Sequence, residues 1–302
     1  DDSHDAPSGG PPADAPRHPF SFRFGGKADD GLLDRWKVER KDEALPEGRA
    51  KSIRTWTDPA TGLVLTWESV RYGDFPALEW ILFLENRGSA DSPLIEDVRA
   101  LDIAISEPLP GEAPYLLHKT NGAPADPSDY EVQAVKMDPK RPQVLAGGGG
   151  RSSNRDLPFF KVETAAASYI VAVGWSGQWQ ARLWAADGVH LRIEAGLEKT
   201  RFILRPGERV RSPRMLVQRT TGDTLEANAL FRQLIYRHYA AKRSGRTPLP
   251  TLFSNTCFTR GGGWLNECNA ENQISLIRAY APLGLEAVIT DAGWFEGGWP
   301  AG

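Results

Sequence analysis

The sequence predicts a multidomain protein, with an antiparallel β-sandwich first and an α/β segment after it. Three observations predict this order. From residue 19 to residue 219, apolar and polar residues alternate in short runs separated by turn sequences. An amphipathic helical pattern then begins at Asp223. Two short apolar runs that flank a second helical pattern follow it, and this order predicts a βαβ unit with parallel strands.

The alternating runs predict the strands of the sandwich. They lie at Leu63–Tyr72, Ala77–Asn86, Tyr169–Trp175, Val189–Ala195 and Thr200–Pro206. Turn sequences such as DPATG, AADG and RPGE separate them. Many strands joined by short polar turns are typical of two packed antiparallel sheets.

The helix after the sandwich has recognisable signals at both ends. Asp223 is a good N-cap residue, and Glu226 three residues later completes a capping-box pattern. Gly245, Pro248 and Pro250 are expected to end this helical region.

The last part of the chain predicts strand, helix, strand. The strands are expected at Thr251–Phe258 and Leu285–Thr290, and the helix at Ala270–Gly284 with Asn269 as a cap. One βαβ unit cannot bury both faces of a parallel sheet, so more strands are needed. We therefore expect this chain to be a fragment of a longer protein.

Composition excludes several classes of function. With a net charge of −3, the chain has no basic field for nucleic acid. No apolar run approaches the ~20 residues of a membrane helix, so no membrane partner is expected. The polar residues 1–18, rich in Pro, Gly and Asp, predict a disordered tail. A signal peptide could have been removed before this tail, which leaves a periplasmic or extracellular location open.

Cysteine and histidine usage predicts no metal site and no cofactor. Cys257 and Cys268 are too few for a disulfide framework, and the five histidines show no ligand spacing. The sequence leaves the compartment undetermined and a homo-oligomer open.

The stretch ITDAGWFEGGW holds the strongest candidate binding residues. Asp291 follows a predicted parallel strand, and ligands of α/β folds gather at the carboxyl ends of such strands. Trp294 and Trp299 follow in the same glycine-rich loop, and an indole suits the face of a sugar ring. The alternatives are a helix cap or turn for Asp291 and plain packing for each tryptophan.

Four motifs occur in an order that resembles a known family. They are YGDFPALEW (Tyr72–Trp80), GGGRSSNRDLPFF (Gly148–Phe160), LRPGE (Leu204–Glu208) and VITDAGWF (Val288–Phe295). The ordered set resembles the α-galactosidase-like enzymes of glycoside hydrolase family 36. The resemblance implies an N-terminal β-supersandwich, a linker helix, a (β/α)8 barrel and a C-terminal β domain, of which this chain holds the N-terminal part only.

The resemblance gives expected domain boundaries. Residues 1–18 are the tail and residues 19–220 the β-supersandwich. Residues 221–250 are the linker helix, and residues 251–302 are the first βαβ unit of the truncated barrel.

The resemblance also implies substrate-binding residues, with departures. The family carries two adjacent aspartates before Gly-Trp that bind sugar hydroxyls; Asp291 matches the first, but Ala292 stands at the second. The first barrel strand of the family ends in Asn/Ser-Trp-Glu, where this chain has Asn255, Thr256 and Cys257. Asn255 remains a candidate polar contact. Because one charged acceptor is missing, galactose itself is in doubt as the substrate.

The GGGRSS run lacks the Lys-Ser/Thr ending of a phosphate loop and no helix follows it. By the resemblance it is a sandwich loop that approaches the barrel mouth, so Arg151 is a candidate substrate contact, with a structural salt bridge as the alternative. The GWSGQW stretch supplies Trp175 and Trp179. Trp179 is a candidate sugar platform, with a core position as the alternative.

The resemblance implies hydrolysis with retention by two carboxyl groups about 5–5.5 Å apart. Both would lie on later barrel strands, so the catalytic residues are unknown here and the fragment is predicted to be inactive alone. The preferred hypothesis is the N-terminal part of a carbohydrate-active retaining α-glycosidase that acts on an oligosaccharide or glycoside. The alternatives are a non-catalytic carbohydrate-binding or scaffolding β-sandwich protein, and a related glycosidase with a substrate other than galactose.

Overall fold

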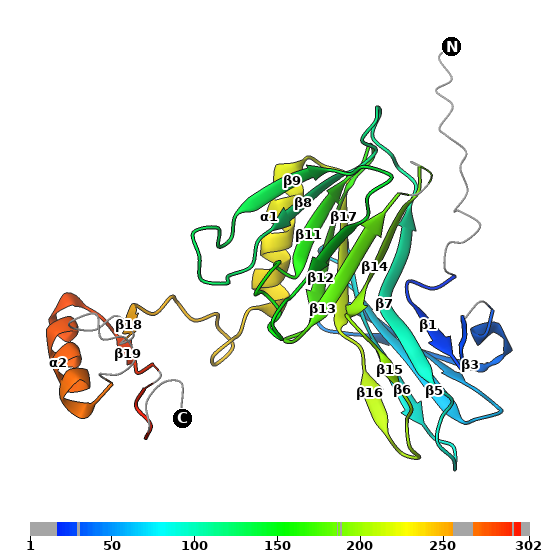
Figure 1. Ribbon diagram of the computed structural model, residues 1–302, viewed down its shortest axis with the longest axis horizontal. Helices are drawn as coiled ribbons and strands as arrows, with labels where there is room; N and C mark the ends of the chain where they lie inside the picture. Colours follow the sequence, from blue (N-terminus) through cyan, green and yellow to red (C-terminus); the bar gives the residue numbers. More distant parts are fainter. Residues whose placement is uncertain are drawn as a thin grey trace. The chain divides into compact units, whose positions relative to one another are not determined.

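The computed structural model describes residues 17–28, 31–185, 187, 189–255, 268–291 and 293–296. Two compact units make up the chain, Asp1–Ile235 and Tyr236–Gly302 (Figure 1). The first unit consists mostly of antiparallel β-sheet, as the sequence predicts. Within the described residues, no helix is both long enough and apolar enough to cross a membrane.

The first sheet holds seven strands within the described residues, and all its pairings are antiparallel. In spatial order they are β10 (Gln143–Ala146), β13 (Trp179–Trp184), β14 (Leu191–Leu197), β7 (Ile95–Ile105), β1 (Ser21–Phe24) and β2 (Lys27–Ala28). The short β15 (Arg201–Phe202) also pairs with β7.

The second sheet holds ten strands within the described residues. In spatial order they are β3 (Lys37–Ala44), β4 (Ala50–Thr57), β5 (Leu63–Arg71), β6 (Ala77–Asn86), β17 (Arg214–Thr220), β12 (Ser168–Gly174), β11 (Phe159–Glu163), β8 (Leu116–Thr120) and β9 (Val132–Lys136). In addition, β16 (Arg209–Arg211) pairs with β6.

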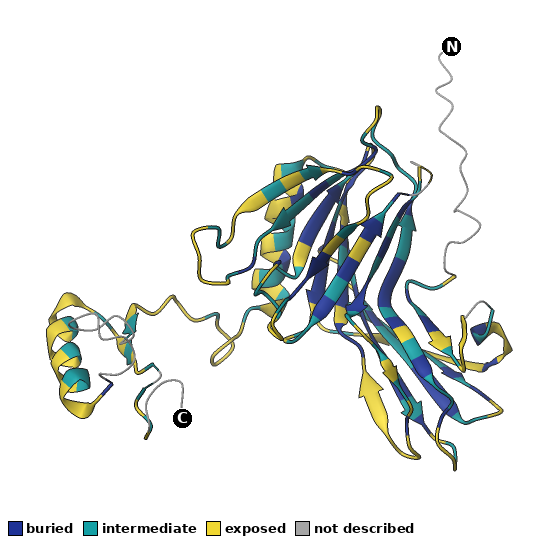
Figure 2. Ribbon diagram, in the orientation of Figure 1, coloured by how far each residue is buried: buried dark blue, intermediate teal, exposed yellow. Residues whose placement is uncertain are grey.

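The hydrophobic core lies between the two sheets (Figure 2). One cluster joins Trp179 and Leu183 of the first sheet to Val171 and Met215 of the second. A second cluster joins strands β1 and β7 to strands β5 and β6, and Trp67 packs against both clusters. Burial on one face of each sheet explains the alternating sequence, because successive strand residues point to opposite faces.

Several strand bounds differ from the sequence prediction. β5 and β6 occupy the predicted runs almost unchanged, while β14 begins at Leu191 rather than Val189. The run Thr200–Pro206 gives only β15, because the chain then crosses from the first sheet to the second. β3, with the sequence KVERKDEA, shows no alternation because it is an exposed edge strand.

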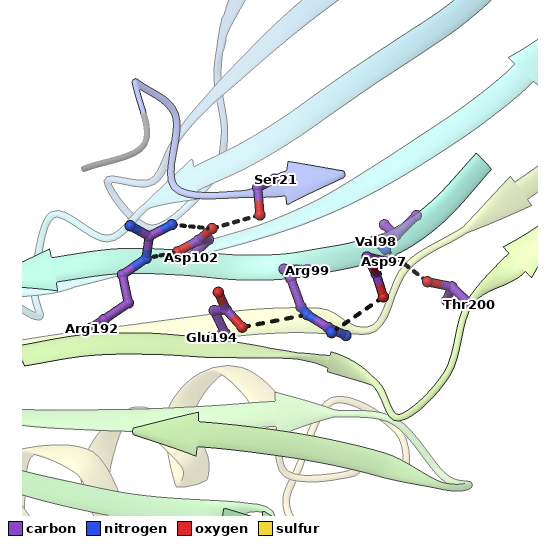
Figure 3. A network of polar contacts seen from close by, with 8 residues as sticks. All are labelled: Ser21, Asp97, Val98, Arg99, Asp102, Arg192, Glu194 and Thr200. Atoms are coloured by element: carbon purple, nitrogen blue, oxygen red, sulfur yellow. Dashed lines mark hydrogen bonds and ion pairs between the residues drawn. The ribbon is translucent and has the colours of Figure 1, made fainter. Parts of the chain in front are cut away.

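A buried ion pair joins three strands of the first sheet (Figure 3). Arg192 of β14 donates two hydrogen bonds to the carboxylate of Asp102 on β7, one of them through Nη2 at 2.8 Å. Ser21 of β1 donates through Oγ to the same carboxylate at 2.5 Å, and Asp102 is only 1% exposed. These bonds hold β1 to the sheet.

Glu194 lies opposite Asp102 in the register of β14 and β7. Burial raises the pKa of Glu194, and the nearby charge of Asp102 raises it further. Arg99 opposes this effect, with Nε 3.5 Å from Glu194 Oε2. Charge at Glu194 is therefore disfavoured by its surroundings.

Helix α1 (Thr224–Leu234) begins where the sequence predicts. Asp223 accepts a hydrogen bond from the backbone N–H of Glu226 at 2.8 Å, which caps the first turn. A π-helical turn, Ile235–Tyr239, follows, so the helical region ends before Gly245 and the later prolines. The helix packs on the second sheet through Leu234, against Ala172 and Leu216.

A polar cluster also joins α1 to the second sheet. Glu163 Oε1 lies 3.2 Å from Lys161 Nζ and 3.0 Å from His118 Nε2, and it accepts a hydrogen bond from Thr224 Oγ1. Burial would raise the pKa of Glu163, but the bonds from Thr224 and Lys161 and the nearby charges outweigh it, so the pKa lies below its ordinary value.

This lowered pKa predicts a loss of stability in acid. A carboxyl group whose pKa is lower in the folded chain stabilises the fold above its unfolded pKa of about 4.5, and that contribution disappears as the pH falls through the lower folded value. We expect Glu163→Gln to reduce the free energy of unfolding at neutral pH by about 1–3 kcal/mol. It should also flatten the decline in acid. Urea denaturation at several pH values would measure both effects; parallel curves for the two proteins would contradict this role.

The second unit contains a parallel strand pair. β18 (Phe253–Asn255) and β19 (Ala287–Ile289) pair in parallel, and α2 (Ala270–Tyr280) lies between them in sequence. Asn269 caps α2 by accepting from the N–H of Asn272 at 3.0 Å, as predicted. After the 3-10 turn Ala281–Leu283, Gly284 ends the helix at φ +87°, a conformation that favours glycine.

Candidate functional site

Two predicted polar residues meet at the carboxyl end of the parallel strands. Asn255 is the last residue of β18 and pairs in register with Ile289, and Asp291 lies two residues beyond β19. Asn255 donates a hydrogen bond through Nδ2 to Asp291 Oδ2 at 2.7 Å. Both strands run in the same direction, so their final side chains are presented at one edge.

The first turn of α2 holds the end of β19 in place. Thr290 Oγ1 donates to Gln273 Oε1 at 3.0 Å. Gln273 Nε2 lies 3.9 Å from the Sγ of Cys268, and that sulfur lies 3.8 Å from the carbonyl oxygen of Asp291. The Thr290 side chain and the Asp291 carbonyl oxygen are therefore contacted by Gln273 of α2 and by Cys268 just before it.

Sequence reasoning did not single out Gln273 as a supporting residue. A signal was nevertheless present. In a βαβ unit the helix runs back along the sheet, so its first turn lies at the same end as the carboxyl ends of the strands. Gln273 lies four residues after the cap Asn269 and is therefore placed beside the loop that follows β19.

Of the two tryptophans in the last loop, Trp294 lies among the described residues. Trp294 is 66% exposed, and its ring meets Phe295 edge to face with centroids 5.5 Å apart. Gly293 precedes it at φ +90°, which turns the chain sharply after Asp291. Trp299 and Ala292 lie outside the described residues.

The glycine-rich loop of the first unit presents Arg151 at the surface. Gly148, Gly149 and Gly150 all have positive φ, so the run of glycines is required by the backbone. Arg151 donates a hydrogen bond to the side-chain oxygen of Asn154. Among the described residues it forms no ion pair, so the alternative of a structural salt bridge is not supported there.

Trp179 is part of the core, and its indole is bonded to the loop that carries Arg151. Its side chain is 0% exposed, and Nε1 donates to the carbonyl oxygen of Ser152 at 2.6 Å. A buried indole offers no open face for a sugar ring, so the expectation of a platform at Trp179 is corrected. Alternation could not decide this, because β12 ends at Gly174 and β13 starts at Trp179 itself.

The hydrogen bond to Ser152 gives a testable role for Trp179. We expect Trp179→Phe to keep most of the buried apolar area but to leave the Ser152 carbonyl without its donor. The expected cost is about 1–3 kcal/mol of unfolding free energy, with faster amide hydrogen exchange in residues 148–153. Unchanged exchange in this loop would show that the indole does not hold it.

The structure assembles the candidate residues in two separate groups. Asn255, Asp291 and Trp294 belong to the second unit, while Arg151 and Trp179 belong to the first. Among the described residues, no group of three or more His, Cys, Asp or Glu side chains could hold a metal ion. The first unit supplies the Arg151 loop. The second unit supplies the Asp291 carboxylate paired with the Asn255 amide at a strand end.

No family model matches the chain, and a search of curated proteins finds no match. Solved structures do match. The GH36 α-galactosidase AgaB from Geobacillus stearothermophilus is 16% identical, with a TM-score of 0.71 over 93% of this chain. The chain shares the fold of the N-terminal region of GH36 α-galactosidases. The GH36 fold therefore accounts for the two packed sheets.

Two further structures with the GH36 fold give the same result. The α-galactosidase from Lactobacillus brevis is 15% identical, with a TM-score of 0.71 over 93% of this chain and 38% of its own. A variant of AgaA from G. stearothermophilus with bound stachyose is 18% identical, with a TM-score of 0.68 over 92% of this chain. This chain spans about 40% of the length of AgaB and 39% of AgaA.

Proposed function

We propose that this chain is the N-terminal part of a carbohydrate-active retaining α-glycosidase of the GH36 type. The observation that carries the proposal is the Asn255–Asp291 hydrogen bond at the carboxyl ends of two parallel strands, in a chain with the GH36 fold. Residues 19–220 would form the β-supersandwich after the tail 1–18. Residues 221–250 would form the linker helix and residues 251–302 the first βαβ unit of a (β/α)8 barrel.

In this proposal Asp291 binds a sugar hydroxyl. An ionised carboxylate has about four lone-pair sites, so it can accept from a hydroxyl while it accepts from Asn255. Asn255 orients the carboxylate, and its remaining amide groups can contact a second hydroxyl. Trp294, with an exposed indole, and Trp299 would lie against the apolar face of the sugar ring. Arg151 would contact the substrate from the sandwich loop.

The reaction itself would use other residues. Retention needs a nucleophilic carboxylate and an acid–base carboxyl group about 5–5.5 Å apart. Asp291 Oδ2 accepts a hydrogen bond from the Asn255 amide, an arrangement that supports a binding role for this carboxylate. The catalytic pair is expected on later strands of the barrel, and the present 302 residues alone are expected to be inactive.

The substrate is proposed to be an α-glycoside other than an α-galactoside. The resemblance places a second sugar-binding carboxylate at position 292, where this sequence has alanine. Losing a charged hydrogen-bond acceptor to a sugar hydroxyl costs about 1.5–3 kcal/mol, which is enough to change the preferred sugar.

A panel of 4-nitrophenyl α-glycosides, assayed with the protein carried past Gly302 through its whole barrel, tests the function. We expect hydrolysis of at least one α-glycoside, with the α-anomer as the first product by NMR. Cleavage of the α-galactoside alone would refute the proposed specificity. Binding of oligosaccharides without hydrolysis of any glycoside would favour the alternative, a non-catalytic carbohydrate-binding or scaffolding protein.

A further inference from the structure

The first unit contains a cavity far in sequence from the candidate site. Its volume is about 490 Å³, within the range of small-molecule sites. It lies between the sheets, with walls from β6, β7, β15 and β16 and from the chain near Trp175. The apolar wall includes Leu82, Leu84, Val98, Trp175, Phe202 and Val210.

The cavity lies where the two clusters of the core meet. Leu82, Leu84 and Val98 belong to the cluster of strands β1, β5, β6 and β7, while Trp175 packs against the other. The pairing of β14 with β7 shifts register between Ala195 and Gly196, next to the point where β14 leaves the core. Such a bulge bends the strand and increases its local twist.

Residues 200–212, which form one side of the cavity, are held in place by hydrogen bonds. Ser212 exchanges two hydrogen bonds with the backbone of Leu82, at 2.9 and 3.0 Å. Thr200 Oγ1 accepts from the N–H of Val98 at 2.7 Å, and Leu204 and Ser92 bond to each other at 2.9 Å. Because these hydrogen bonds fix residues 200–212 to the neighbouring strands, the cavity is preformed and is not a gap that can collapse.

The charged residues of the cavity are all basic. Lys199, Arg201 and Arg211 line it, and no carboxylate of the described residues does. Arg201 pairs with Glu96 outside the lining at 3.2 Å, and Arg211 lies over the Trp175 ring at 4.9 Å. Lys199 is exposed and has no ion-pair partner among the described residues.

We propose that this cavity binds a small amphiphilic anion, with an apolar aromatic or alkyl body and one carboxylate or sulfonate group. The apolar body would fill the space between Leu84, Val98 and Phe202, where it removes apolar surface from water. The anionic group would lie at the rim beside Lys199 and Arg211. A sugar is disfavoured here, because the apolar walls leave its hydroxyl groups without partners.

Titration of the chain with 1-anilinonaphthalene-8-sulfonate, followed by fluorescence and calorimetry, tests the proposal. We expect saturable binding of one molecule per chain and competition by decanoate. Val210→Trp should weaken the affinity at least tenfold by filling the cavity, since Val210 is 38% exposed and a larger side chain there does not disturb the core.

Charge variants test the anionic part separately. Lys199→Glu should weaken the sulfonate probe at least fivefold and leave displacement by neutral decanol unchanged. Lys140→Glu makes the same change in charge in the exposed turn before β10 and should change neither. Near-UV circular dichroism should be the same for the two charge variants as for the unchanged protein.

Four results would overturn the proposal. The first is no saturable binding, and the second is binding that Val210→Trp leaves unchanged. The third is a dimer in sedimentation that Val210→Trp dissociates, which would assign the opening to a second copy of the chain. The fourth is equal weakening of sulfonate binding and decanol binding by Lys199→Glu, which would refute the role of the anionic group.

Discussion

Replacing Asp291 by asparagine is expected to lower kcat/KM for the preferred α-glycoside by about 10- to 100-fold in the protein with its whole barrel. The variant keeps the size of the side chain but removes the charge that would accept from a sugar hydroxyl, a loss of about 1.5–3 kcal/mol. It also turns the Asn255–Asp291 bond into a contact between two amides. Initial rates with the best nitrophenyl glycoside would measure the effect.

The matched control is Asp138→Asn, in an exposed turn of the first unit. It makes the same chemical change away from the site, so its kcat/KM should match that of the unchanged protein. Asn255→Ala is expected to have a smaller effect than Asp291→Asn, because it removes a neutral donor. Unchanged kcat/KM in Asp291→Asn, with a folded protein, would show that this carboxylate does not bind the substrate.

Replacing Asp102 by asparagine is expected to have the largest effect on stability, a loss of about 3–5 kcal/mol of unfolding free energy. The substitution removes the charge that the Arg192 guanidinium, only 19% exposed, bonds to, and it weakens the bond from Ser21 (Figure 3). Urea denaturation at neutral pH would measure the loss. A change below about 1 kcal/mol would show that the ion pair contributes little.

Glu194→Gln is the control for Asp102, in the same sheet and directly opposite it. Because burial already raises the pKa of Glu194, its charge is disfavoured, and a neutral side chain there should cost little or add stability. In addition, the double variant Asp102→Leu with Arg192→Met should be more stable than Asp102→Asn, since neither charge is then left buried alone.

Periodicity predicted the strands whose two faces differ and missed those whose faces are alike. β14 alternates because one face lies in the core, and the sequence predicted its run with a start two residues too early. β3 is exposed on both faces, so it does not carry the signal. Which strands pair could not be predicted, because β17 joins β6 and β12 across long stretches of chain.

The candidate site was predictable where it depends on local order. A strand end predicts where Asp291 and Asn255 lie, and a parallel pair brings such ends together. The burial of Trp179 depends on packing between the sheets, which no local pattern contains. The support from Gln273 depends on the helix lying beside the strand end, which requires the tertiary structure.

A crystal structure of the protein with its whole barrel and a bound α-glycoside tests the central claim most directly. The account predicts a sugar hydroxyl within about 2.5–3.0 Å of an Asp291 carboxylate oxygen, with Asn255 still bonded to that carboxylate. A sugar bound elsewhere, with Asp291 covered by other parts of the chain, would contradict it.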